Sequence, residues 1–229
     1  MEAMPPNADT PLVPGPIYGI RTWVVVGEPG AERLAGPQSR TPWPDGGAWL
    51  EASCATDPAH AAPEHGCICG LHAWHPDAYN ARRVLATRRE VAGVVECDGT
   101  IEVHAEGFRA QRGRPHAIIV TPMRNAALAG RLAAAYDAEV ASVAGPDALA
   151  DWCHDRGLGL AVPVVDEMLG PDAAGRARRE GRRRARRLVA GFLVWMLISI
   201  VLTLIAVVAW PDPSGPHDVY GRAGHVHIP

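Results

Sequence analysis

Several kinds of residue are scarce or missing in this chain of 229 residues, and each absence narrows the possibilities. The chain contains no lysine, so all 22 basic residues are arginines. Its five cysteines are odd in number and unevenly spaced, which argues against the disulfide framework of a secreted protein. Residues 1–16 have no basic start and no apolar run, so we expect no N-terminal signal peptide.

Positive charge is scarce in most of the chain. Residues 1–170 contain 13 arginines and 21 acidic residues, a formal balance of −8. Because binding to phosphates needs clustered cations, this acidic part argues against a nucleic-acid partner. The missing positive charge is concentrated in residues 176–187, which contain eight arginines and one glutamate.

The order of apolar segments and turn signals predicts one domain over residues 17–160. The preceding residues 1–16 include five prolines and little to bury, so we predict that they are disordered. Residues 17–26 are apolar and β-branched, as in a buried strand. A helix is expected over residues 76–89, where Pro76 suits the first turn.

The clearest turn signal of the domain is the dipeptide Asp98-Gly99. It separates two apolar segments, residues 91–97 and 100–105, and this pattern predicts a β-hairpin with a two-residue turn. Such a hairpin would hold Cys97 and His104 far apart along its strands. We therefore do not expect these two residues to form a nucleophile–base pair.

The last part of the domain changes its hydrophobic period. Residues 116–121, 123–136, 139–143 and 146–156 are expected to form strand, helix, strand and helix, which predicts a small parallel β-α-β-α portion. The segment between the first strand and its helix contains no glycine, so a phosphate-binding loop is not indicated. The predicted fold class is α+β, with a hairpin and this portion in a small mixed β-sheet.

Residues 54–70 contain three of the five cysteines, among prolines and glycines that prevent a long helix or strand. Soft ligands crowded into a loop that cannot form an apolar core of its own indicate a metal ion, most simply zinc. Structural zinc sites take four ligands in a tetrahedron, often cysteines with one or two histidines. We predict a zinc-stapled loop with the ligands Cys54, His60, Cys67 and Cys69.

The spacing of the last two cysteines, Cys67 and Cys69, is C-x-C and not the more usual C-x2-C. Gly66 and Gly70 flank the pair and permit the sharp turn that would bring both thiolates to one metal. A disulfide between the two would be strained.

Alternatives to this ligand set remain open. His65 or His72 could replace His60 as the nitrogen ligand, and iron could replace zinc. Reduced cysteines without a metal are a further alternative.

Residues 60–73 read His-Ala-Ala-Pro-Glu-His-Gly-Cys-Ile-Cys-Gly-Leu-His-Ala. With Cys54 upstream, this run resembles an H-x-A-P-x3-C-x-C-G-[IL]-Y-A motif in uncharacterised proteins of high-GC Gram-positive bacteria and their phages. Gly15–Trp23, Gly93–Val95 and Gly107–Ala110 match further segments of that family. The chain departs from the motif by placing a histidine where the family has tyrosine. The resemblance implies a shared site and no particular activity.

Residues 188–210 contain no charged side chain and would extend about 35 Å as a helix, enough for a hydrocarbon core of about 30 Å. We predict one C-terminal transmembrane helix there. Residues 161–187 are then a linker and an Arg-rich juxtamembrane segment, and residues 211–229 are an extracytoplasmic tail.

The arginines beside this predicted span set its orientation, because juxtamembrane cations mark the cytoplasmic side. We expect a single-pass protein of the plasma membrane with residues 1–187 in the cytoplasm. The segment Arg176–Arg187 would also attract anionic lipids, by about 1 kcal/mol per residue near the surface. Ser199 and Thr203 could hydrogen-bond across a pair of helices and so support a homo-oligomer; the alternative is bonding to their own backbone.

The favoured function is that of a non-enzymatic, membrane-anchored interaction or regulatory protein with an unidentified protein partner. A closed four-ligand site has no position for water, and the other candidate residues form no nucleophile–base pair. The alternative is a metal-dependent enzyme, or a thiol or metal sensor, that uses the same loop. With only three ligands, a metal-bound water could be activated by Glu64 or His65.

Overall fold

The structure is a computed structural model that describes residues 16–86, 90–122 and 126–209. It divides into two compact units, the first ending at Ala177 and the second beginning at Arg178. The disorder expected for residues 1–16 and the tail expected over residues 211–229 lie almost entirely outside the described residues.

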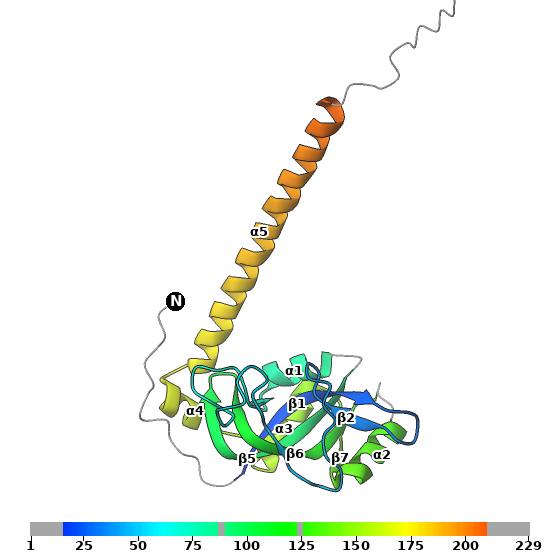
Figure 1. Cartoon of the computed structure of the whole chain (residues 1–229). Coiled ribbons are helices and arrows are strands. Elements are labelled where there is room, and N and C mark those ends of the chain that lie inside the picture. The colour runs from blue at the N-terminus through cyan, green and yellow to red at the C-terminus, as the bar shows by residue number, and fades with distance from the viewer. Residues whose placement is uncertain (1–15, 87–89, 123–125, 210–229) are drawn as a thin grey trace, which may run out of the picture. The chain divides into compact units, whose positions relative to one another are not determined.

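The first unit is a mixed α/β domain (Figure 1). Its elements are β1 (Ile17–Val26), β2 (Arg33–Ala35), β3 (Leu50–Glu51), β4 (Leu71–Trp74), α1 (Ala78–Ala86), β5 (Val91–His104), β6 (Gly107–Val120), α2 (Ala126–Tyr136), β7 (Glu139–Ser142), α3 (Pro146–Asp155), α4 (Val162–Leu169) and the first turn of α5 (Ala173–Ala209).

Four strands of the sheet close on one another. β1 pairs with β5 along most of its length and meets β4 at a single pair, Ile20 with Trp74. β4 and β5 both pair with β6, which completes the ring. Inside it, a Cβ on Gly19 would come within 2.8 Å of Ala73 and Phe108, so the strands can approach only where one of them carries glycine.

Two apolar layers lie on the faces of the sheet. One buries Trp23, Trp43 and Phe108 together with residues of α2, and the other lies between the sheet and the helices α1 and α3. The hydroxyl of Tyr136, on α2, accepts a hydrogen bond from the Leu34 N–H at 2.8 Å and donates one to the Trp43 carbonyl at 3.3 Å. This pairing satisfies the one polar atom that a tyrosine brings into the core.

The predicted hairpin around Asp98-Gly99 is wrong. β5 continues through these residues, and the chain turns back at Ala105 and Glu106, between His104 and its partner Gly107. The Asp-Gly pair forms an irregularity within β5, where Gly99 has a positive φ of 81°. The side-chain oxygen of Gln111 on β6 accepts a hydrogen bond from the Thr100 N–H at 3.1 Å. This bond stabilises the local turn conformation of the Asp-Gly pair inside the strand.

The predicted β-α-β-α portion is present. β6 and β7 pair in parallel across α2, and α3 follows with Asp147 in its first turn. The expected helix over residues 76–89 is α1, which is described from Ala78 to Ala86. In place of the linker expected over residues 161–175, the chain forms α4, where Val165 is buried and Val162 is 60% exposed.

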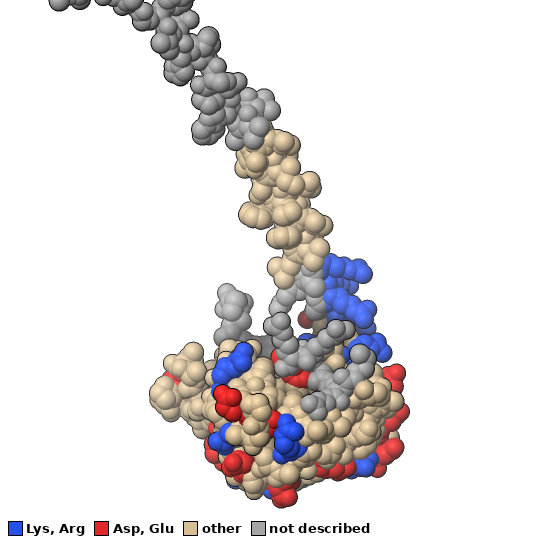
Figure 2. Space-filling model, turned by 90° about the vertical axis from the view of Figure 1, so that its right-hand side faces the viewer, with Lys and Arg blue, Asp and Glu red and all other residues tan. Residues whose placement is uncertain are grey.

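The described part of the second unit is the rest of α5, and this helix is long and apolar enough to cross a membrane by length and composition. The 18 residues Leu188–Ile205 have a mean hydropathy of 2.7. Figure 2 shows arginine side chains gathered on the turns before this segment and an uninterrupted uncharged surface along it. The Thr203 hydroxyl donates to the Ser199 carbonyl at 2.8 Å, so it bonds to its own helix.

Glycine at position 107 should be essential for the ring. A Cβ there would lie 2.1 Å from the Ala73 carbonyl oxygen and 2.9 Å from the Trp74 Cα, both of them backbone atoms. We expect Gly107→Ala to lower the free energy of unfolding by about 2–3 kcal/mol. The control is Gly130→Ala, because Gly130 lies in α2 with open space around it. This change should raise stability by about 0.5–1 kcal/mol.

Denaturant unfolding of the full chain in detergent micelles, followed by the fluorescence of the buried tryptophans, would measure both changes. Equal effects of the two substitutions would contradict the close contact between β4 and β6.

Candidate metal centre

The loop between β3 and β4 carries the predicted ligands and lies against the outer face of β6. Its fold depends on Gly70, which has a φ of 117° and would place a Cβ 3.1 Å from the Cβ atoms of Arg109 and Pro63. Gly66 also has a positive φ, 81°, and the Cys67 N–H closes a turn onto the Glu64 carbonyl at 3.1 Å. The two glycines thus make the sharp turns on either side of the C-x-C pair.

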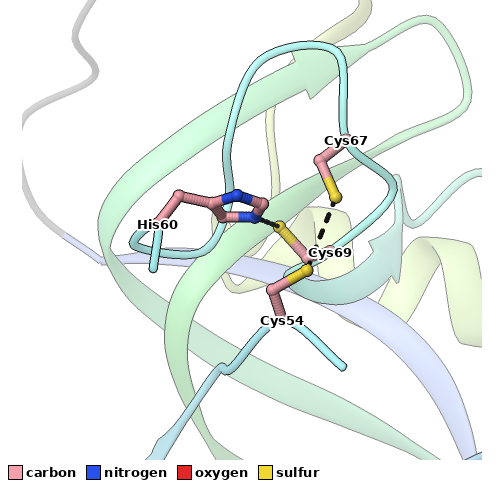
Figure 3. Close-up of side chains that lie close together, drawn as sticks. All are labelled: Cys54, His60, Cys67 and Cys69. Atoms are coloured by element: carbon pink, nitrogen blue, oxygen red, sulfur yellow. Dashed lines mark hydrogen bonds between the residues drawn. The ribbon is translucent and has the colours of Figure 1, made fainter. Parts of the chain in front are cut away.

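Cys54, His60, Cys67 and Cys69 lie together in a group that could hold a metal ion (Figure 3). One donor atom from each lies within 4.8 Å of all the others. The sulfurs of Cys54 and Cys67 are 3.7 Å apart, and His60 Nε2 is 3.3 Å from the Cys69 sulfur.

These two distances fit a tetrahedral site. In a tetrahedron, bonds of about 2.3 Å to sulfur and about 2.0 Å to nitrogen place two sulfurs about 3.8 Å apart, and a sulfur and a nitrogen about 3.5 Å apart. A metal with this ligand set would leave no open coordination position. The donor set of three sulfurs and one imidazole nitrogen suits zinc or another soft cation.

The groups around the ligands favour binding of a cation. The carboxylate of Asp57 lies 3.7 Å from His60 Nδ1, which leaves Nε2 free to face the sulfurs. Hydrogen bonds from the Thr56 hydroxyl and the Asp57 N–H lower the pKa of the Cys54 thiol to about 6. Burial raises the pKa of Cys69, and a bound cation would offset this cost by favouring the thiolate.

The two rival histidines lie outside this group. His65 is half exposed, and its Nδ1 lies 4.0 Å from a carboxylate oxygen of Glu102. The Nε2 of His72 lies 2.9 Å from the Ile68 carbonyl oxygen, within hydrogen-bonding distance. The structure therefore places His60, and neither of these two, beside the three sulfurs.

The two remaining cysteines are packed in the core. Cys97 and Cys153 are fully buried, and burial raises the pKa of each thiol to about 12. Cys97 and His104 lie on opposite sides of the irregularity that separates Asp98 from Ile101 in β5. Neither thiol has the acidity of a nucleophilic cysteine.

A cavity of about 540 Å³ opens beside the loop. Ile68, between two of the predicted ligands, is 85% exposed and forms part of its wall. Trp74 on β4 and Phe108 on β6 also line it. The predicted metal loop therefore forms one boundary of a largely apolar hollow.

Sequence reasoning assigned no role to Arg109 and Glu102, which contact the loop from the sheet. Arg109 was part of the matched segment Gly107–Ala110, but its role depends on the strand register that brings it beneath the loop. Asp57 was also missed, although its spacing of three residues from His60 could have indicated a carboxylate behind a ligand.

Comparisons of the chain with protein-family models, curated proteins and solved structures find no match. The resemblance to the motif in proteins of high-GC Gram-positive bacteria and their phages therefore stays a prediction.

Loss of one ligand should release the metal. We expect Cys67→Ser to lower the metal content of the purified full chain and its melting temperature, because the remaining three ligands no longer close the site. His65→Ala should change neither, since His65 lies outside the group. Elemental analysis and thermal unfolding would measure both quantities. An equal loss from the two substitutions would overturn the choice of His60.

Proposed function

We propose that this chain is a single-pass membrane protein whose cytoplasmic domain is stabilised by zinc and binds a protein partner. The observation that carries the proposal is the group of four soft ligands, which could close a tetrahedral site without room for a water molecule. Such a site supports a structural role for the metal and gives no support to hydrolytic chemistry.

The proposed anchor is the apolar part of α5, Leu188–Ile205. Arginines precede it along the same helix, and juxtamembrane arginines favour the cytoplasmic side and anionic headgroups. The domain would then lie in the cytoplasm at the inner face of the plasma membrane, with the C-terminal tail outside. All five cysteines precede the anchor and would share the reducing compartment, which suits metal thiolates better than disulfides.

The surface beside the metal loop supports the interaction role. Ile68 is the most exposed large apolar side chain of the described part of the first unit, and it borders the cavity lined by Trp74 and Phe108. Exposed apolar groups with a neighbouring hollow are a common feature of protein-binding surfaces. Because Ile68 lies between two proposed ligands, the metal would fix the position of this contact.

A thiol or metal sensor is the second candidate, and the 3.7 Å between the sulfurs of Cys54 and Cys67 favours it. Hydrogen peroxide could take two electrons from the two thiolates and join them as a disulfide, and two protons from the solvent would complete its reduction to two water molecules. The oxidised pair could no longer bind the metal, which would leave the site. Loss of the metal under peroxide, with its return on reduction, would support this candidate.

A single labelling experiment tests the orientation and the metal together. The full chain would be produced in a bacterial host, and right-side-out and inside-out membrane vesicles would be treated with a maleimide that cannot cross membranes. A membrane-permeant chelator would be added to half of each sample. We expect three thiols to react, only in inside-out vesicles and only after chelation, and one zinc per purified chain. Cys97 and Cys153 should stay unlabelled in the folded protein because they are buried.

The outcomes separate the two parts of the proposal. Labelling in right-side-out vesicles would overturn the orientation without touching the metal site. Three reactive thiols before chelation, with no metal in the purified protein, would overturn the zinc site without touching the anchor.

A further inference from the structure

Arg109 lies near the start of β6 and has two neighbours in register across the sheet. Glu102 on β5 and His72 on β4 are its Cα partners, so the three residues form one row beneath the metal loop. The side chain of Arg109 is only 6% exposed. A buried guanidinium carries a large desolvation cost, so its contacts should have a specific purpose.

The guanidinium reaches the backbone of two proposed metal ligands. Its Nη1 donates to the carbonyl oxygens of Cys67 and Cys69, the second at 2.9 Å. Its Nη2 forms an ion pair with Glu102, and its Nε donates to His104 Nε2 at 3.2 Å. All three guanidinium nitrogens therefore have partners. Two residues of β5, Glu102 and His104, hold the planar group, and its Nη1 faces the loop.

This contact explains how a C-x-C pair could serve one metal. Two cysteines separated by one residue reach a common ion only if the backbone turns sharply between them. A single nitrogen that bonds to the carbonyls of both cysteines fixes that turn. Gly70, packed 3.1 Å from the Arg109 Cβ, lets the loop come close enough for these bonds.

Charge also favours this position. Zinc with three thiolates and a neutral imidazole carries a net charge of −1, and a guanidinium beside it offsets that charge in a site of low dielectric. Glu102 holds the guanidinium in the same place before a metal arrives. The group that positions the ligands is therefore in place before the metal binds, and this should slow the release of the metal.

We propose that Arg109 is the positioning residue of the metal centre, which holds Cys67 and Cys69 in the conformation that binds one ion. This inference rests on the proposed metal site and goes beyond it, because no other described residue is hydrogen-bonded by its side chain to both carbonyls. A lysine has one ammonium group in place of the fork, and it could not hold both the loop and Glu102 in the same way.

The test uses cobalt(II) in place of the native metal, in the full chain in detergent micelles. Cobalt reports tetrahedral geometry by its visible bands and the number of thiolate ligands by its near-ultraviolet charge-transfer band. Three substitutions would be compared with the wild type: Arg109→Met, Arg109→Lys and Arg83→Met. Arg83 is the matched control because it pairs with Glu106 at 3.3 Å, lies over Trp74 and contacts none of the four ligands in the described contacts.

We expect Arg109→Met to weaken the charge-transfer band and to speed cobalt release to a competing chelator by about 10-fold to 100-fold, in line with the usual loss of metal affinity when a residue that supports the ligands is removed. Arg109→Lys should give an intermediate rate, and Arg83→Met should match the wild type. If Arg109→Met does not fold, Arg109→Lys gives the same comparison.

Wild-type spectra and release rates in both Arg109 variants would overturn the positioning role. A wild-type chain that binds no cobalt in a tetrahedral thiolate site would instead overturn the proposed metal centre, so the two failures are distinguishable.

Discussion

The fold depends on the hydrogen-bonded register of β6. This strand pairs with β3, β4, β5 and β7, so a shift of one residue would exchange its inner and outer faces against four neighbours at once. In the observed register, Phe108 and Ala110 point into the ring of strands, and Arg109 lies between them on the outer face. Alternate residues of this one strand therefore pack in the core and contact the loop that carries the predicted metal ligands.

The charged side chains around the loop come both from the loop itself and from the sheet, where the register of β6 positions them. The two carboxylates that support the ligand group act from different sides: Asp57 faces the imidazole of His60 from within the loop, and Glu102 holds Arg109 from the sheet. The acidic residues of the domain are therefore not all free surface charges, because some of their carboxylates form ion pairs with buried or half-buried arginines. Arg112 and Arg114 follow the same pattern further along β6, where they pair with Asp98 and Glu96 across the hairpin.

The sequence predicted those parts of the structure that depend on residues close together in the chain. The β-α-β-α portion follows from a change of period, and the ligand group follows from residue types crowded into one loop. The turn of the hairpin was predicted at the wrong place. Asp98-Gly99 is a strong turn signal, but pairing with β6 keeps these residues inside β5. The true turn, at Ala105 and Glu106, carries no such signal. The role of Arg109 could not be read in advance, because it depends on which residues of β4 and β5 lie opposite it.

The position of the loop between β3 and β4 has an energetic consequence. β3 has two residues and β4 has four, so each strand contributes few hydrogen bonds of its own to the sheet. A metal bound by Cys54 and Cys69 would close a loop of about 15 residues, and a cross-link of that length removes roughly 3 kcal/mol of chain entropy from the unfolded state. In a compartment that keeps thiols reduced, a metal can supply this effect where a disulfide cannot. The pairing of β3 and β4 with β6 would then be the part of the sheet whose local opening reports on metal supply.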